Sequence, residues 1–153
     1  MNREAFGSLM GELTAIIGDR AVEPALEAGL QAEAGTDSDL FHRVEAACHA
    51  AIEAGWMCKH EAGGIRYGRV LKPSPELGGY SVDVVMMRDL AGPHHRHPRG
   101  EIDMIMPIDP AARFDGHGRG WCVYGPDTAH SPTVSGGSAL VLYLLPGGEI
   151  EFS

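Results

Sequence analysis

The spacing of apolar residues along the chain changes character near Gly55. Before this residue, apolar side chains recur every three or four positions, which is the period of an amphipathic α-helix. Three helices are expected: one ending at Gly18, one running from about Pro24 to Ala34, and one between Asp39 and Gly55. Residues 1–55 therefore form a helical N-terminal segment whose apolar faces must be covered, either by the rest of the chain or by a partner subunit.

After Gly64 the apolar residues form short runs, several of them rich in β-branched or aromatic side chains. Strands are expected at residues 65–71, 80–87, 101–107, 120–124 and 139–145. Glycine and proline mark the turns between them, and Ser135-Gly136-Gly137 is expected to be a hairpin loop. Short antiparallel strands joined by tight turns predict a β-sandwich or a barrel over residues 56–153.

Composition and charge narrow the class of protein. The chain has 153 residues, of which 44% are hydrophobic and 22% charged, as expected of one globular domain. Its net charge of −9 argues against a nucleic-acid partner, and no segment has the apolar length of a signal peptide or a membrane span. Cys48, Cys58 and Cys122 have no paired spacing and are expected to be reduced thiols, so a cytoplasmic location is expected.

The sequence HRHPRGE at residues 95–101 contains three potential metal ligands. Side chains alternate along a strand, so His95 and His97 point to the same side, and the proline and glycine that follow can turn Glu101 toward the same point. A second segment punctuated by glycine and proline ends at His130. Three imidazoles and one carboxylate suit one divalent transition metal ion, with iron, manganese or zinc favoured and the choice among them open. The alternatives are a solvated histidine-rich loop or an acid-sensing cluster.

These two segments resemble the paired motifs of the cupin superfamily. The first cupin motif has two histidines one residue apart, a short spacer and a glutamate; the second has glycine, five residues, proline and a last histidine. This chain departs from the second motif, because Thr128 stands where the family usually has glycine and the last histidine comes one residue early. The resemblance implies a mainly β fold, the double-stranded β-helix or jelly-roll barrel, preceded here by the helical segment. It also implies a ligand set of His95, His97, Glu101 and His130.

A closer resemblance, to the 4-hydroxylaminobenzoate lyase family, extends from about Gly55 onward. It is carried by residues 62–70, 81–85, 92–107, 124–134 and 139–148, and more loosely by the helical part. The resemblance implies a bacterial enzyme of nitroaromatic breakdown that converts 4-hydroxylaminobenzoate to 3,4-dihydroxybenzoate and releases ammonia. The implied partner is a small aromatic acid, and a homodimer is expected.

Candidate catalytic and substrate-binding residues follow from strand alternation. Asp103 lies two residues after Glu101 and should face the same way, so it could accept a proton or orient a ligating histidine; it could equally lie exposed at a strand end. Glu101 is expected to serve as both ligand and catalytic group. Of Arg66 and Arg69, three residues apart, only one can face the interior; Arg66 is the preferred partner of the substrate carboxylate, although both could be surface residues. Tyr124 is expected to contact the substrate ring, with a core position as the alternative.

The sequence is also compatible with two other classes of function. The chain could be a cupin dioxygenase acting on an aromatic acid, in which case it would consume oxygen. It could also be a non-enzymatic cupin that binds a small molecule, although no basic patch or DNA-binding helix pair accompanies the predicted strands.

Overall fold

A computed structural model describes all 153 residues and contains the three expected helices, α1 (Arg3–Ile17), α2 (Leu26–Glu33) and α3 (Asp39–Glu53). The Asn2 side chain caps α1 by accepting a hydrogen bond from the amide of Ala5, and Gly18 ends that helix with a positive φ of 59°. Ser38 caps α3 in the same way. The second helix begins at Leu26, two residues later than expected, because residues 23–25 form a separate turn. No helix is long and apolar enough to cross a membrane.

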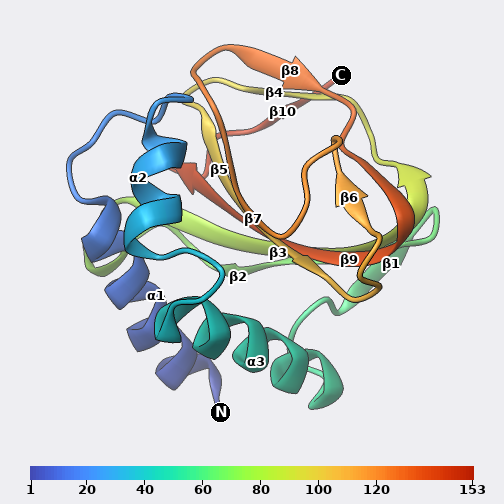
Figure 1. The fold of residues 1–153 in the computed structure, drawn as a ribbon, viewed down its shortest axis with the longest axis horizontal. Helices are drawn as coiled ribbons and strands as arrows, with labels where there is room; N and C mark the ends of the chain where they lie inside the picture. The colour runs from blue at the N-terminus through green and yellow to red at the C-terminus, as the bar shows by residue number, and fades with distance from the viewer.

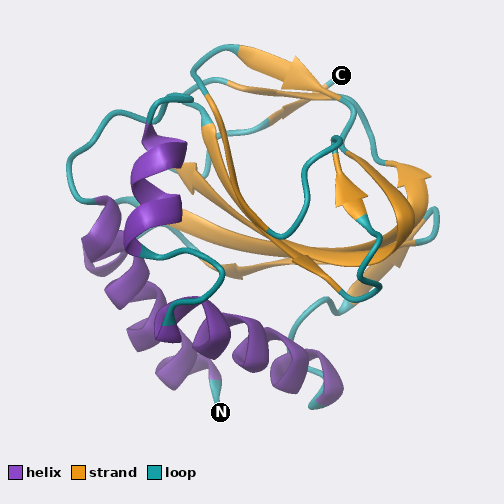
Figure 2. Ribbon diagram, viewed as in Figure 1, coloured by secondary structure: helices purple, strands orange, loops and turns teal.

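The rest of the chain forms two antiparallel sheets (Figures 1 and 2). The large sheet has the order β1-β2-β3-β9-β5-β7, with β6 also paired to β9, and the small sheet has the order β10-β4-β8. The strands of the large sheet are β1 (His60–Ala62), β2 (Ile65–Leu71), β3 (Tyr80–Ala91), β5 (Glu101–Pro107), β6 (Arg113–Phe114), β7 (Gly120–Tyr124) and β9 (Thr133–Pro146). Those of the small sheet are β4 (His95–His97), β8 (Thr128–His130) and β10 (Glu151–Phe152), and a short 3₁₀ helix, η1 (Pro75–Leu77), precedes β3.

The predicted mainly β fold with preceding helices is confirmed, and the five expected strands are all present. Strand pairing does not close a barrel, however, because no ladder joins the two sheets. In Figure 1 the small sheet lies across from the long strands β3 and β9, and the helices lie against the other face of the large sheet. The large sheet is therefore the middle layer of the molecule.

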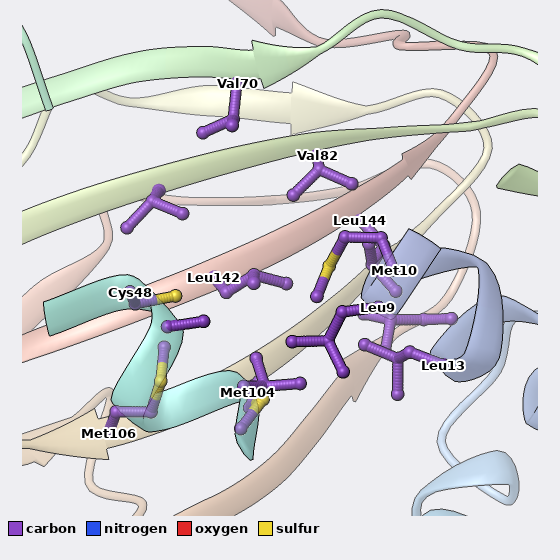
Figure 3. Close-up of a cluster of buried hydrophobic side chains, with 14 of the residues drawn as sticks. Leu9, Met10, Leu13, Cys48, Val70, Val82, Met104, Met106, Leu142 and Leu144 are labelled. Carbon is purple, nitrogen blue, oxygen red and sulfur yellow. The ribbon is translucent and has the colours of Figure 1, made fainter. Parts of the chain in front are cut away.

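Side-chain alternation gives the large sheet two different faces. One face carries Val82, Met104 and Leu142, which share one buried core with residues of all three helices. Figure 3 shows this cluster, in which Leu9 and Met10 of α1 lie against those strand residues. The chain's own sheet thus covers the apolar faces of the helices, and no partner subunit is needed to bury them. The expected homodimer stays a prediction. The opposite face of the sheet is turned toward the small sheet.

The segment Ser135-Gly136-Gly137 is not the hairpin loop that its composition indicates. It lies inside β9, which runs without interruption from Thr133 to Pro146. The pairing of β3 with β9 changes register here, and the Asp89 carboxylate accepts a hydrogen bond from the amide of Gly137. The two glycines, with φ of 77° and 127°, allow this bulge to form.

Helix α2 covers the free edge of the large sheet at β7. The Trp121 indole donates a hydrogen bond of 2.7 Å to the carbonyl of Ala34, and the Glu27 carboxylate accepts one of 3.0 Å from the amide of Val123. The Gln31 amide also donates to the carbonyl of Trp121. These contacts satisfy edge groups that would otherwise be open to another chain.

Replacing Trp121 with phenylalanine should lower the free energy of unfolding by about 1–3 kcal/mol, because the buried carbonyl of Ala34 loses its partner. Urea denaturation would measure this change. Trp56→Phe is the control, since the half-buried Trp56 packs on Phe6 near the helix surface. Equal losses in the two variants would show that the hydrogen bond to Ala34 contributes nothing.

Candidate metal centre

The pairing of β4 with β8 brings the histidines together. His95 lies directly opposite His130 in this register, and His97 lies opposite Thr128. Glu101 begins β5, just after a turn that contains Gly100. Gly100 has a φ of 91°, and a Cβ there would lie 2.7 Å from a methyl carbon of Val22 and 2.8 Å from the carbonyl of Tyr124. Only glycine fits this turn, which directs the Glu101 carboxylate back toward β4.

The predicted ligand set comes together at one point. The Nε2 atom of His95 lies 2.9 Å from that of His97 and 3.1 Å from that of His130. A carboxylate oxygen of Glu101 lies 3.3 Å from Nε2 of His97. All four ligand atoms lie within 4.8 Å of one another, and three of the four residues are buried.

The partners of the other ring nitrogens fix the tautomers of the three histidines. Nδ1 of His95 lies 3.2 Å from the carbonyl of Pro93, which can only accept, so this nitrogen carries the proton. Nδ1 of His97 lies 3.0 Å from the hydroxyl of Thr128, whose own proton goes to the carbonyl of Gly125. The hydroxyl must therefore accept from His97 as well.

His130 follows the same rule, because its Nδ1 lies 2.6 Å from the Asp115 carboxylate. In the neutral rings, all three Nε2 atoms are then unprotonated and direct their lone pairs toward one another. Burial lowers the pKa of His95, which favours its neutral form. Three converging lone pairs repel unless a cation lies between them, so the donor set fits a divalent metal ion.

Asp115 organises this side of the site and is not among the residues expected from the sequence. One of its oxygens accepts from His130 and, at 2.5 Å, from the Tyr124 hydroxyl; the other accepts from the amide of Thr133 at 2.9 Å. Burial alone would raise the pKa of Asp115, but these contacts outweigh it and lower the pKa, so the carboxyl is ionised. Its sequence context, Asp115-Gly116, indicates only a turn, and nothing in the spacing links it to His130.

Two carboxyl groups on β5, Glu101 and Asp103, face the site. Glu101 presents a carboxylate oxygen 3.3 Å from Nε2 of His97, at the point where the imidazole lone pairs converge, as a metal ligand would. Burial and the neighbouring Glu101 charge raise the pKa of Asp103 well above its usual range. Asp103 is fully buried, and neither of its oxygens has a hydrogen-bond partner in the chain. The structure thus places Asp103 beside the candidate centre, on the same side as Glu101.

A cavity of about 390 Å³ opens beside the histidines, between the two sheets. His95, Glu101 and Asp103 line one part of it, and most of the remaining wall is apolar, including Val85 and Val141. No lysine or arginine is among the lining residues. An apolar cavity with a few polar groups at one end is the usual form of a small-molecule site.

The model of the family described as PnbB, 4-hydroxylaminobenzoate lyase, matches residues 8–152. The chain belongs to the 4-hydroxylaminobenzoate lyase family. A relative of that name from Nocardioides sp. (strain LMS-CY) is 34% identical, over 88% of this chain and 85% of its own. Another, from Pseudomonas putida, is 26% identical over 98% of this chain and 95% of its own. The solved structure of an RmlC-like cupin protein from Ralstonia eutropha JMP134 is 15% identical, covers 60% of each chain, and has a TM-score of 0.45.

Arg66, the expected carboxylate partner, does not reach the cavity of this lyase-family protein. Its neighbours Ile65 and Tyr67 line the cavity, so alternation turns Arg66 to the opposite face of the sheet. Arg69 lies on the cavity side instead, where it donates to the Asp83 carboxylate at 3.2 Å. As expected, only one of the two arginines lies on the cavity side of the sheet. That residue is Arg69, although it does not line the cavity.

Tyr124 lies behind the histidines, not along the cavity wall. Its ring stacks on that of His97, with centroids 5.5 Å apart, and its hydroxyl is bound to Asp115. It supports the candidate ligands, and the cavity lining does not include it. His94 precedes β4, lies outside the cluster and contacts the Ser153 hydroxyl at the surface.

Replacing Asp115 with alanine should weaken divalent metal binding by about tenfold to a hundredfold, because His130 loses the group that fixes its tautomer and ring orientation. Competition with a chelator would measure the affinity, and circular dichroism would confirm folding. Glu151→Ala is the control, because Glu151 pairs with Arg96 of β4 at the surface. Unchanged affinity in Asp115→Ala would mean that the strand pairing alone orients His130.

Proposed function

We propose that this member of the family is a metal-dependent lyase that converts 4-hydroxylaminobenzoate to 3,4-dihydroxybenzoate with release of ammonia. The observation that supports it most is the set of three unprotonated Nε2 atoms and one carboxylate beside an apolar cavity. The reaction balances with water alone, since the hydroxylamino compound and one water have the atoms of the dihydroxy product and ammonia. The activity therefore needs no oxygen.

His95, His97, Glu101 and His130 are the residues proposed to hold one divalent ion, with iron, manganese or zinc favoured. When bound, such an ion would supply Lewis acidity toward the hydroxylamine oxygen and would lower the pKa of a coordinated water. The apolar wall of the cavity fits the faces of an aromatic ring, and it excludes water that would otherwise compete for the polar groups.

Asp103 is proposed to move protons in this reaction. Its carboxyl lines the cavity next to Glu101, and neither of its oxygens has a hydrogen-bond partner in the chain, so this group can interact with a substrate. The nitrogen–oxygen bond breaks more easily when its oxygen is protonated, and the ring must later lose a proton to become aromatic again. A carboxyl group beside the ring can serve both steps, first as donor and then as acceptor.

The test of the activity is an anaerobic assay with 4-hydroxylaminobenzoate that follows ammonia and 3,4-dihydroxybenzoate. We expect both products in equal amounts without oxygen. Oxygen consumption matched to substrate loss would identify an aromatic-acid dioxygenase instead, and binding without turnover would identify a non-enzymatic binding protein. Either result would refute the lyase proposal.

Metal binding through the predicted ligands can be tested with substitutions of neighbouring histidines, two inside the cluster and one outside it. Purified wild-type protein and the His94→Ala variant should each hold about one divalent ion per chain, because His94 lies outside the cluster. The His95→Ala/His97→Ala double variant should lose both the ion and the activity. Elemental analysis measures the content, and equal metal in all three proteins would show that the ion binds elsewhere.

Changing Asp103 to asparagine should lower kcat by about a hundredfold or more while the metal content stays normal, because an amide cannot carry the proton. Wild-type turnover in this variant would remove Asp103 from the mechanism. Loss of the metal would instead assign Asp103 to support of the ligands.

A further inference from the structure

Tyr143 lies in the middle of a row of side chains that crosses the cavity face of the large sheet. On β9 it is directly opposite Asp83 of β3 on one side and Asp103 of β5 on the other. Its neighbour two residues earlier, Val141, also lines the cavity, so the Tyr143 ring is on the cavity side of the strand. The tyrosine and Asp103 thus form adjacent parts of one wall.

Asp103 differs from the other acid of this row in having no protein partner. Neither oxygen of the fully buried Asp103 makes a hydrogen bond within the chain, and Tyr143 lines the same cavity beside it. The other acid of the row is different, because Asp83 is held by Arg69 at 3.2 Å and by the Ser81 hydroxyl at 3.3 Å. Buried polar groups are normally paired, so the unpaired carboxyl of Asp103 on a cavity wall, next to a tyrosine of the same wall, points to a ligand.

The charges around Tyr143 restrict what that ligand can be. Burial, followed by the nearby carboxyl groups of Asp83, Glu101 and Asp103, raises the pKa of Tyr143 well above its usual range, so its hydroxyl is a proton donor at neutral pH. A substrate carboxylate placed here would lie close to the Glu101 carboxylate, and no lysine or arginine lines the cavity to pair with it. An uncharged group that both donates and accepts hydrogen bonds needs no such partner.

We propose that Tyr143 and Asp103 form a polar subsite that binds the uncharged hydroxylamino end of the substrate, with Tyr143 donating to its oxygen. The substrate carboxylate then points toward the open end of the cavity, where the lining residues Tyr67 and Phe152 are 40% and 64% exposed. In this orientation the substrate needs no arginine on the cavity wall, because solvent water hydrates its carboxylate. The inference rests on the proposed substrate, and it adds the direction in which that substrate lies.

The test compares two analogues of the same shape that differ in one hydroxyl group, 4-(hydroxymethyl)benzoate and 4-ethylbenzoate. Their dissociation constants are measured by calorimetry for wild-type protein, Tyr143→Phe and Tyr80→Phe, with metal content recorded for each. Tyr80 is the matched control, because it is a buried tyrosine near the start of β3 that belongs to the core shared with the helices. In Tyr143→Phe the preference for the hydroxymethyl analogue over the ethyl analogue should fall about threefold to tenfold.

Affinity for 4-ethylbenzoate should be the same in all three proteins, and Tyr80→Phe should keep the wild-type preference. An unchanged preference in Tyr143→Phe would overturn the subsite, and so would wild-type protein that binds neither analogue. Failure of the ammonia assay alone refutes the lyase activity and leaves the binding comparison to decide the subsite, so the two proposals fail separately.

Discussion

The arrangement of the site depends on one constraint, which is that three imidazole rings must present unprotonated Nε2 atoms to the same point. A neutral histidine can do this only if its Nδ1 proton has an acceptor. The chain supplies three different acceptors: the carbonyl of Pro93, the hydroxyl of Thr128 and the carboxylate of Asp115. Each acceptor lies in a different loop or strand. The folding of those segments is therefore part of building the site.

The two faces of the large sheet have different roles: one packs against the helices and stabilises the fold, and the other carries the candidate site. The outer face is apolar and buries its side chains against the helices. This burial provides hydrophobic stabilisation, which the polar groups of the site do not provide. The inner face carries the buried carboxyl groups of Asp83, Glu101 and Asp103, and removing such groups from water costs free energy. A sheet stabilised from one side can tolerate such groups on the other.

Much of this arrangement could be predicted from the sequence, because it follows from local rules. Strand alternation placed Asp103 on the same side as Glu101, and the two short motifs identified the four residues that converge. The composition of Ser135–Gly137 was misleading, since two glycines suit a bulge within a strand as well as a hairpin loop. Asp115 could not be found, because its role depends on the folding of a turn against His130, and no sequence rule gives that contact.

The choice between Arg66 and Arg69 shows a different limit. Alternation states that the two must face opposite ways, but which one faces inward depends on the phase of β2, and that phase is fixed by pairing with β3. The pairing sets Arg69 opposite Asp83, where the two charges offset each other on the inner face. An arginine bound in this way is not free to hold a substrate carboxylate. A chain with a net charge of −9 and no free cation on the cavity wall can accept an anionic aromatic acid most readily with the charged end toward solvent and the uncharged end inward.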